Sequence, residues 1–496
     1  MKKLKILIFL LLTLLIGCSS LKEHKTPEEV VNSCYIGMGY TELTYNLGKS
    51  YPYFENVKDT IGVKEINNCN EKKVLELYKN AGTKGYGDNS PYWRWSVEFT
   101  EKQLETLLWK NLVSVKKSRP SNVYLYRDKK WVLEKEIEKF PLGNLKDIKV
   151  IKRGDSTIAM DLLIIGSRNT YVVTKELNIR RVLNFSQNSR MAKTDVELKS
   201  SLGRVLGKNM TTLPSAFFSI EKKSGKYYFY GGGFGHGVGM PQYTAYDLTK
   251  KKRYDYKEIL ERYYPNTKLK KSKVVQNFKE ELLVGITNNN SLEHKNIKLI
   301  SKEEILISYG KSSNKIKKNS VIEIVKEGKN IVVKLAGKKI LASETEIKIV
   351  SKGKITVTSI KRSLKSINPS YYGEFIVKPY GNNLILANKV NIEDYLKGVV
   401  VSEMPISFGL EPLKAQAITA RTYAISAFTK NRYKKYGVNL DDTVSNQVYN
   451  NKDENDLVNK AIKETKALII TYENIPVETF FYSTSSGFSA TPLEVW

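Results

Sequence analysis

The sequence predicts an α+β fold, in which a mixed helix and strand domain is assembled from two halves of the chain and accompanied by a small β-rich module. Residues 76–270 mix stretches of helical periodicity with β-branched runs. Residues 289–362 consist mainly of β-branched runs between Gly-Lys turns, and residues 363–496 lead from a hairpin pattern into two helical stretches. With 496 residues, the chain can bury two or three hydrophobic cores.

Residues 1–18 have the pattern of a secretory signal. Lysines at the start precede an apolar run through Ile16, which is too short for a comfortable membrane span. Leu15-Ile16-Gly17-Cys18 resembles the bacterial lipobox, which would make Cys18 the lipidated first residue of the mature protein. We therefore expect an exported chain, lipid-anchored on the extracytoplasmic side of a bacterial membrane. Residues 19–75 are predicted to be a spacer and the start of the first half.

The composition restricts the possible partners without choosing one. Lys and Arg exceed Asp and Glu by 81 to 51, and a net charge of +30 favours an anionic neighbour such as nucleic acid, a membrane surface or an acidic wall polymer. A proteome that uses lysine on solvated surfaces explains the charge equally well. Export makes nucleic acid an unexpected partner. Cys34 and Cys69 could form a disulfide, and no Cys-x-x-Cys or His-Glu-x-x-His pattern predicts a metal site or cofactor.

The first half contains four predicted elements and one unusual stretch. A helix is expected over 101–112, strands within 147–173, a short helix over 195–207, and an amphipathic helix over 256–269 that Pro265 stops. Between the last two lies 230-YGGGFGHGVGMPQYTAY-246. This stretch matches neither Gly-x-Gly-x-x-Gly nor a phosphate loop, so a nucleotide site is poorly supported. Because glycine lets another segment approach the backbone closely, we predict that it forms one wall of a cleft.

The second half begins after a lysine-rich linker predicted over 271–288. The β-rich module is expected over 289–362 and the remaining segment over 363–496. That segment starts with a hairpin that turns at Gly-Asn-Asn and runs into a helix capped near Asn391. A second helix is predicted from Glu411 to about Thr429. Its apolar stripe is Leu413, Ala417, Ala420, Ala424 and Ala427.

Several long motifs in both halves resemble the SpoIID/LytB family, named after stage II sporulation protein D. They are Asn391-Ile392-Glu393-Asp394-Tyr395-Leu396, Gly398-Val399-Val400, Ser402-Glu403-Met404-Pro405, 414-KAQAITARTYAI-425, 443-TVSNQVYNN-451, 480-FFYSTSSGFS-489 and 235-GHGVGMPQYTA-245. The resemblance extends over 51–267 and 283–496. In the family the Ser-Glu-Met-Pro segment precedes the Gly-His-Gly-Val-Gly segment, so the motif order here is reversed, as in a circular permutation.

A genuine permutation predicts that the mature N-terminus and Trp496 lie near each other, because permutation is tolerated where termini are adjacent and exposed. The rival explanation is a join of two incomplete copies, in which each half needs a partner chain. The joined fragments could then also be inactive, which is a third possibility beside the two functions named below.

The resemblance implies a peptidoglycan lytic transglycosylase, which cuts glycan strands at MurNAc-GlcNAc bonds and leaves 1,6-anhydro-MurNAc ends. It implies Glu403 as the catalytic acid. Physically, glycoside cleavage needs a carboxyl that is still protonated near neutral pH, and partial burial beside Val399, Val400 and Met404 raises a carboxyl pKa. Glu393, Asp394 and Glu411 compete for this role, but their place at helix starts explains them through the helix dipole. The alternative function is a non-catalytic, LytB-like peptidoglycan-binding enhancer of a cell-wall amidase.

Further side chains are predicted to bind the glycan strand around Glu403. They are His236, Gln242, Lys414, Gln416, Arg421, Tyr423, Gln447, Ser483 and Ser485. His236 is equally well explained as a buried structural histidine. Lys414 and Arg421 have the alternative of pairing with acids, as helix-face cations usually do. The turn Ser483 to Gly487 is expected to bring hydroxyls beside Glu403.

Overall fold

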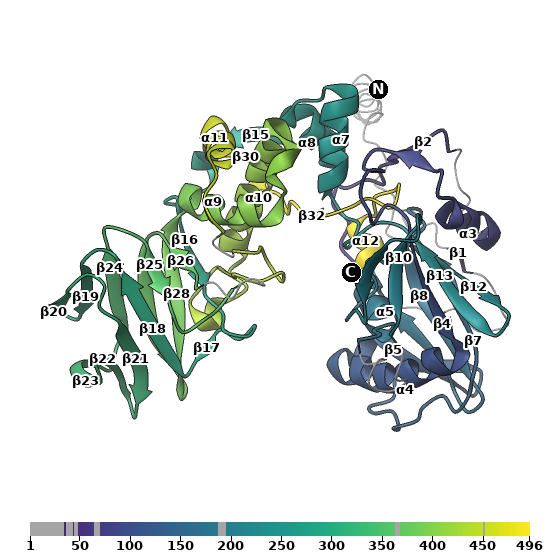
Figure 1. Ribbon diagram of the computed structural model, residues 1–496, viewed down its shortest axis with the longest axis horizontal. Helices are drawn as coiled ribbons and strands as arrows, with labels where there is room; N and C mark the ends of the chain where they lie inside the picture. The colour runs from purple at the N-terminus through teal and green to yellow at the C-terminus, as the bar shows by residue number, and fades with distance from the viewer. Residues whose placement is uncertain are drawn as a thin grey trace, which may run out of the picture.

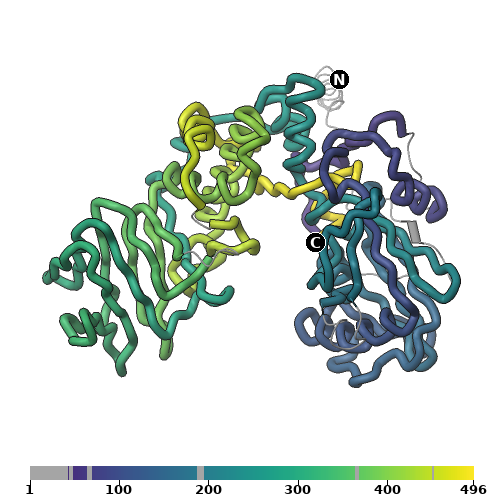
Figure 2. The backbone as a smooth tube through the Cα atoms, in the orientation of Figure 1, coloured from purple at the N-terminus to yellow at the C-terminus, as the bar shows by residue number. Residues whose placement is uncertain are grey.

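The computed structural model describes residues 34–35, 43, 48–63, 70–186, 195–362, 368–449 and 452–496. Two lobes are joined through a group of helices that lies between them (Figures 1 and 2). We call residues 48–241 the N lobe, residues 281–391 the C lobe, and the helices α7 to α11 the helical bridge. The molecule combines helices with largely antiparallel sheets, which confirms the predicted α+β class. Cys18, the signal segment and Cys69 lie outside the described residues.

The N lobe contains two antiparallel sheets. The six-stranded sheet has the order β1 (Cys34–Tyr35), β7 (Leu145–Arg153), β8 (Ala159–Gly166), β9 (Thr170–Thr174), β5 (Val123–Arg127), β6 (Lys130–Val132). The five-stranded sheet has the order β11 (Val205–Lys208), β10 (Glu197–Ser200), β4 (Trp95–Thr100), β13 (Lys226–Gly231), β12 (Phe218–Lys223). The other elements are the pair β2 (Thr60–Ile61) and β3 (Lys84–Gly85), η1 (Pro120–Asn122), α3 (Glu71–Lys79), α4 (Glu101–Ser118) and α5 (Glu176–Val182). The strands predicted within 147–173 are confirmed as β7, β8 and β9.

The predicted helix over 101–112 is confirmed as α4. Thr100 and Gln103 form a reciprocal capping box at its start, which satisfies amide groups that the first turn leaves unpaired. Its core-facing side chains repeat at helical spacing. They are Leu104, Leu107, Leu108, Leu112 and Val115.

The short helix predicted over 195–207 is wrong, because this segment forms the hairpin of β10 and β11. The spacing of Leu198, Leu202 and Val205 suits one helix face, yet Leu198 is fully buried whereas Leu202 is 89% exposed. Strand β10 pairs with β4, where Leu198 lies opposite Val97. Pairing with an existing sheet therefore overrode a weak helical pattern.

The C lobe also contains two sheets. The eight-stranded sheet has the order β20 (Ser312–Ile316), β19 (Ile305–Tyr309), β24 (Ile347–Ser351), β27 (Glu374–Tyr380), β28 (Asn383–Asn391), β16 (Glu281–Gly285), β29 (Leu440–Asp441), with β17 (Glu293–His294) also on β28. The six-stranded sheet has the order β23 (Lys338–Ser343), β22 (Asn330–Leu335), β21 (Ile322–Glu327), β18 (Asn296–Ser301), β25 (Ile355–Val357), β26 (Ser370–Tyr371). The range 271–288 differs from the predicted linker, because it contains β16 and its alternating apolar residues Leu282 and Val284 are buried. The strands of 289–362 share their larger sheet with β16, β27, β28 and β29.

The helical bridge joins segments from both halves of the chain. Its parts are α7 (Gln242–Lys252), α8 (Tyr256–Tyr263), η2 (Ser272–Val274), α9 (Ile392–Glu403), η3 (Ile406–Phe408), α10 (Leu410–Lys430), η4 (Lys434–Tyr436), α11 (Asp456–Glu464) and the sheet β15 (Lys268–Lys271), β30 (Leu468–Tyr472), β31 (Ile475–Pro476). Helix α10 packs against α7, α8, α9 and α11. Its predicted stripe is buried from Leu413 through Ala424, and these small side chains allow close packing on several neighbours.

After the bridge, residues 477–496 return to the N lobe and run beside the glycine-rich stretch. Strand β32 (Phe481–Tyr482) pairs in parallel with β14 (Met240–Pro241), and Phe234 exchanges backbone hydrogen bonds with Thr484. Gly239 has a φ of +77°, and a Cβ atom there would lie 2.0 Å from the Phe480 carbonyl oxygen. The glycines therefore let this C-terminal segment lie directly against the backbone of the loop.

Replacing Gly239 with Ala is expected to lower the free energy of unfolding by about 2 kcal/mol or more, because it adds backbone strain and a clash with a carbonyl group. Gly225→Ala is the matched control, since Gly225 has a φ of +70° but nothing within 4 Å of an added Cβ. Denaturant unfolding of both variants measures the difference. Equal losses of unfolding free energy in the two variants would show that the close approach of Phe480 is not the reason for glycine at position 239.

The beginning of the described N lobe lies against the C-terminal residue. A Cβ atom on Gly48 would lie 2.6 Å from the Trp496 carbonyl oxygen and 2.5 Å from that of Pro492, in α12 (Pro492–Val495). The side chain of Asn56 donates a hydrogen bond to Glu494 at 2.8 Å. Gly48 thus lies against Trp496, whereas the mature N-terminus itself lies outside the described residues.

No helix among the described residues is both long enough and apolar enough to cross a membrane.

Candidate functional site

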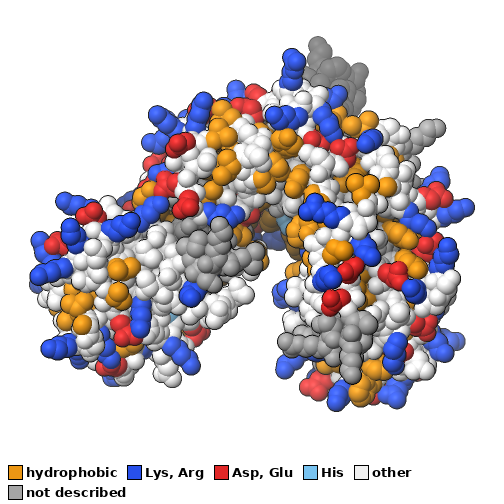
Figure 3. Space-filling model, in the orientation of Figure 1, with side chains coloured by type: hydrophobic (Ala, Val, Ile, Leu, Met, Phe, Trp, Pro, Cys, Tyr) orange, Lys and Arg blue, Asp and Glu red, His pale blue; other side chains and the backbone are white. Residues whose placement is uncertain are grey.

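Glu403 is the last residue of α9, in the helical bridge. Asn391 caps the start of the helix by accepting a hydrogen bond from the Glu393 backbone N–H at 2.9 Å. The helix ends at Glu403 because Pro405 follows, and proline disfavours helical geometry in the residue before it. The space-filling view shows the molecule hollowed between the two lobes beneath the bridge (Figure 3).

The carboxyl of Glu403 is half-buried and has one backbone hydrogen-bond donor. The N–H of Val448 donates to its Oε1 at 2.6 Å. Burial raises the pKa of Glu403 to about 7, although the Val448 hydrogen bond and the charge of Lys452 both lower it. At neutral pH the side chain is therefore present in both protonation states, as a group that gives and then takes a proton requires.

Gln242 joins the glycine-rich motif to the Ser-Glu-Met-Pro motif. Its Nε2 donates to the backbone oxygen of Glu403 at 3.0 Å and to Oε1 of Gln416 at 3.2 Å. Both glutamine side chains are buried, and Nε2 of Gln416 has no hydrogen-bond partner in the described part of the chain. Residues from opposite halves of the chain thus meet at the backbone of Glu403.

His236 lies in an aromatic environment formed by the returning C-terminal segment. Its ring centroid is 5.5 Å from Trp496, 5.7 Å from Tyr482 and 6.0 Å from Phe480, and Nδ1 accepts a hydrogen bond from the Val238 backbone N–H. Burial, with a smaller effect of the Arg180 charge, lowers the pKa of His236 to about 4. The imidazole is therefore neutral near pH 7.

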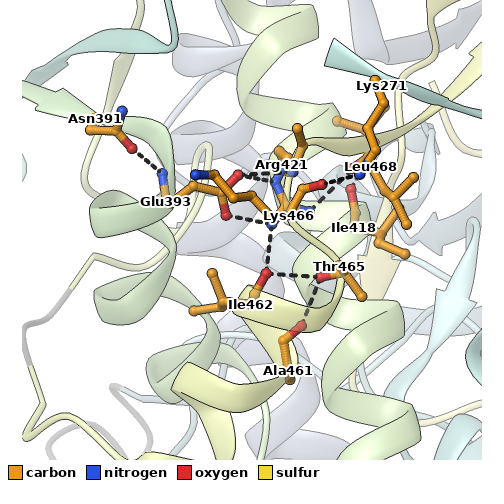
Figure 4. Close-up of polar contacts among 12 residues, drawn as sticks. Lys271, Asn391, Glu393, Ile418, Arg421, Ala461, Ile462, Thr465, Lys466 and Leu468 are labelled. Atoms are coloured by element: carbon orange, nitrogen blue, oxygen red, sulfur yellow. Dashed lines mark hydrogen bonds and ion pairs between the residues drawn. The ribbon is translucent and has the colours of Figure 1, made fainter.

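Arg421 and Lys414 both form ion pairs with acidic side chains, which is the alternative to glycan binding for these two residues. Arg421 is fully buried and forms a bidentate ion pair with Glu393, at 2.9 and 2.6 Å, while its third nitrogen donates to the Leu468 carbonyl (Figure 4). Lys414 lies between Glu411 and Glu464, at 2.9 and 2.7 Å. The structure thus gives both cations a role in holding segments together.

Two other predicted glycan contacts are also engaged internally. Gln447 is fully buried, accepts a hydrogen bond from Tyr395 and donates to the Ala420 carbonyl. Ser485 is fully buried, and its hydroxyl accepts from the Gly487 N–H at 3.0 Å. No hydroxyl of the Ser483 to Gly487 turn is found hydrogen-bonded to Glu403 among the described residues, which differs from the expectation. The turn instead serves to anchor the C-terminal segment in the N lobe.

Tyr423 and Ser483 keep part of their surface exposed. The Tyr423 hydroxyl lies 3.5 Å from Asn446, at a small polar pocket that also includes Lys430, Arg432 and Glu478. The Ser483 backbone oxygen accepts a hydrogen bond from the Tyr243 N–H in the first turn of α7, and the Ser483 hydroxyl lies 3.2 Å from the Thr484 hydroxyl.

Sequence reasoning missed Val448 and Lys452 as neighbours of Glu403. Val448 acts through its backbone N–H, so no side-chain pattern could have indicated it. Lys452 is one of many lysines, and only the fold brings its charge near the carboxyl. The described residues contain no group of three or more His, Cys, Asp or Glu side chains arranged to hold a metal ion.

Comparison with known proteins identifies one family model and several relatives. Residues 380–472 match the family model described as SpoIID, stage II sporulation protein. The chain is 36% identical over 121 residues to stage II sporulation protein D of Bacillus amyloliquefaciens, covering 22% of this chain and 35% of that protein. It is 38% identical over 101 residues to the amidase enhancer of Bacillus subtilis, covering 20% of this chain and 13% of that protein.

An uncharacterized protein of Brachyspira hyodysenteriae is 34% identical over 166 residues, covering 33% of this chain and 44% of that protein. The chain thus spans less than half the length of each of these relatives. No solved structure matches the chain. The matched segment contains α9, Glu403 and α10, so this part of the chain is similar to the SpoIID family.

Proposed function

We propose that this protein is an exported peptidoglycan lytic transglycosylase that cuts glycan strands with Glu403 as its acid and base. The observation that carries the proposal is a half-buried carboxyl with a pKa of about 7, joined through Gln242 to the glycine-rich motif of the other half. A relative named stage II sporulation protein D and one named amidase enhancer support a role at the cell wall. Glycan strands are the proposed substrate.

In the proposed reaction, protonated Glu403 donates its proton to the glycosidic oxygen while the bond from that oxygen to the anomeric carbon of MurNAc breaks. The 6-hydroxyl of the same MurNAc then attacks the anomeric carbon and gives its proton to the Glu403 carboxylate. A 1,6-anhydro ring and a free GlcNAc end are formed, no water is consumed, and the acid is regenerated. One carboxyl with a pKa near neutrality is sufficient for both steps.

The competing acids are already engaged in other contacts, which supports a single-carboxyl scheme. Glu393 binds Arg421 and also accepts from the Ala467 N–H at 3.1 Å. Glu411 binds Lys414 and accepts from the Tyr256 N–H at 3.0 Å. Both carboxylates neutralise cations or helix starts, whereas burial raises the pKa of Glu403.

Activity is expected to fall as pH rises through about 7, because the deprotonated carboxyl cannot start the reaction. Lys452→Met removes a positive charge that lowers the pKa of Glu403, so the alkaline limb of kcat/KM should move up by a few tenths of a pH unit. Lys463→Met, at an exposed position of α11, is the control. A downward shift, or the same shift in both variants, would contradict the assignment of this limb to Glu403.

A non-catalytic enhancer of a cell-wall amidase is the second candidate, favoured by the similarity to the amidase enhancer. It predicts that the Glu403→Gln protein still stimulates a purified cell-wall amidase on intact peptidoglycan, and that wild-type protein releases no anhydro ends. Mass spectrometry of the glycan products distinguishes the two functions. Anchoring through Cys18 is part of the proposal and is tested by metabolic labelling with a fatty acid analogue, which a Cys18→Ala protein should not incorporate.

A further inference from the structure

A group of aromatic side chains from the N lobe and the helical bridge has no part in the reaction described above. We call Tyr92, Phe234, Tyr243 and Phe408 the aromatic shelf. The rings of Tyr92 and Phe234 stack at 4.6 Å with planes 24° apart, and those of Tyr243 and Phe408 meet edge to face at 5.0 Å. Figure 3 shows hydrophobic side chains gathered over the bridge.

Backbone hydrogen bonds fix the shelf residues to one another. The Tyr92 carbonyl accepts from the Gly233 N–H at 2.8 Å, next to Phe234. Phe234 and Tyr243 donate their own N–H groups to the adjacent carbonyls of Thr484 and Ser483, at 2.9 and 3.0 Å. The returning C-terminal segment therefore holds the backbones of Phe234 and Tyr243, and the same segment carries the partly exposed Ser483.

The shelf is continuous with the site of Glu403. Gln242, which directly precedes Tyr243, donates to the Glu403 backbone oxygen at 3.0 Å. Phe408 ends the short helix that follows Met404 and Pro405, and its N–H donates to the Pro405 carbonyl at 3.1 Å. A chain molecule held at Glu403 can therefore extend along the shelf.

Tyr92, Phe234 and Tyr243 each keep part of their surface exposed, whereas Phe408 is buried beneath Tyr243 and Tyr246. Partly exposed aromatic rings on rigid backbone are typical of binding surfaces. Sugar rings offer a face of C–H groups that packs on an aromatic ring and an edge of hydroxyls that takes hydrogen bonds. The shelf provides both types of partner, through its rings and through the hydroxyls of Tyr92, Tyr243 and Ser483.

We propose that the aromatic shelf binds sugar rings of the glycan strand beyond the pair at the cleaved bond. The inference rests on the proposed function for the identity of the ligand. It adds a length requirement: strands long enough to reach from Glu403 onto the shelf bind more tightly than a disaccharide does.

The test measures the binding of peptide-free glycan oligomers of increasing length to full-length Glu403→Gln protein, so that no product forms. Affinity should rise with length until the shelf is filled. Adding Tyr92→Leu or Phe234→Leu should weaken binding of long oligomers by about 10-fold and leave the disaccharide affinity unchanged. Tyr92→Phe keeps the ring and should retain most of the affinity.

Tyr228→Leu is the matched control, because Tyr228 also stacks on a partly exposed ring, that of Tyr230, on strand β13. It should leave glycan binding unchanged. Equal affinity of the shelf variants and their parent for long oligomers would overturn the inference. So would loss of amidase binding in these variants with unchanged glycan affinity, since the shelf would then be a protein interface. The transglycosylase proposal is tested by a separate measurement, because its failure would be seen as an absence of anhydro products from wild-type protein.

Discussion

Replacing Glu403 with Gln is expected to reduce the release of 1,6-anhydro ends from glycan strands by at least about 100-fold. The amide cannot donate the proton that the glycosidic oxygen needs, nor accept one from the 6-hydroxyl. Its oxygen can still accept the hydrogen bond from the Val448 N–H, so the local structure should be retained. Liquid chromatography with mass spectrometry of digested glycan measures the products.

Stability measurements distinguish a chemical defect from a folding defect in this variant. Burial raises the pKa of Glu403 to about 7, so the folded state loses stability as pH rises from the ordinary pKa of a glutamate to about 7, and the Gln variant avoids this cost. At pH 8 the variant should be more stable than wild type, on the order of 1–2 kcal/mol once partial exposure is considered. Glu261→Gln, on the exposed surface of α8, should change neither property. Unchanged turnover by Glu403→Gln, or ordinary reducing ends from wild type, would refute the proposed mechanism.

Replacing Arg421 with Met is expected to lower the free energy of unfolding by about 3–5 kcal/mol, because it leaves the Glu393 carboxylate without its buried partner. Figure 4 shows this ion pair between α9 and α10, beside the segment from Ala461 to Leu468. The Lys271 ammonium, from the other half of the chain, donates to the Lys466 carbonyl at 2.7 Å in the same region. Loss of the pair should therefore loosen the helix that ends at Glu403 and lower activity as well.

The double variant Arg421→Met with Glu393→Leu separates charge from packing. It removes both charges, so it should recover much of the stability that Arg421→Met loses. Denaturant unfolding of wild type, the single variants and the double variant gives the coupling energy. A double variant as unstable as the sum of the single variants would show that the ion pair itself is not what joins α9 to α10. A single cooperative transition in wild type would also argue against a pair of inactive fragments.

The sequence predicted helices and turns correctly where a residue pattern was compatible with only one local structure. Thr100 with Gln103 and the Leu repeat after them define α4, and the Gly-Asn-Asn turn with Asn391 defines the hairpin and cap of α9. The prediction of a helix over 195–207 was wrong because the apolar spacing suits either a helix or a hairpin, and pairing with β4 favoured the hairpin. The prediction of a linker over 271–288 was wrong because the many lysines obscured the alternating buried residues of β16.

For the candidate site, the sequence could indicate side chains but not their partners. Arg421 and Lys414 were identified as polar residues on one helix, yet whether they face a glycan or an acid depends on where α9 and α11 pack. The hydrogen bond from Val448 could not be predicted, since every residue except proline carries the same N–H group.

The sequence by itself determined the α+β class, the helix that carries Glu403, and the resemblance that led to Glu403. These follow from local periodicity and from motifs whose residues are close in the chain. Only the tertiary structure decided that Gln242 meets Glu403, that the glycines receive the returning C-terminal segment, and that Gly48 lies against Trp496. The physical reason is that the pKa of a carboxyl and the contacts of a loop depend on what packs around them, and packing joins residues without regard to their order in the chain.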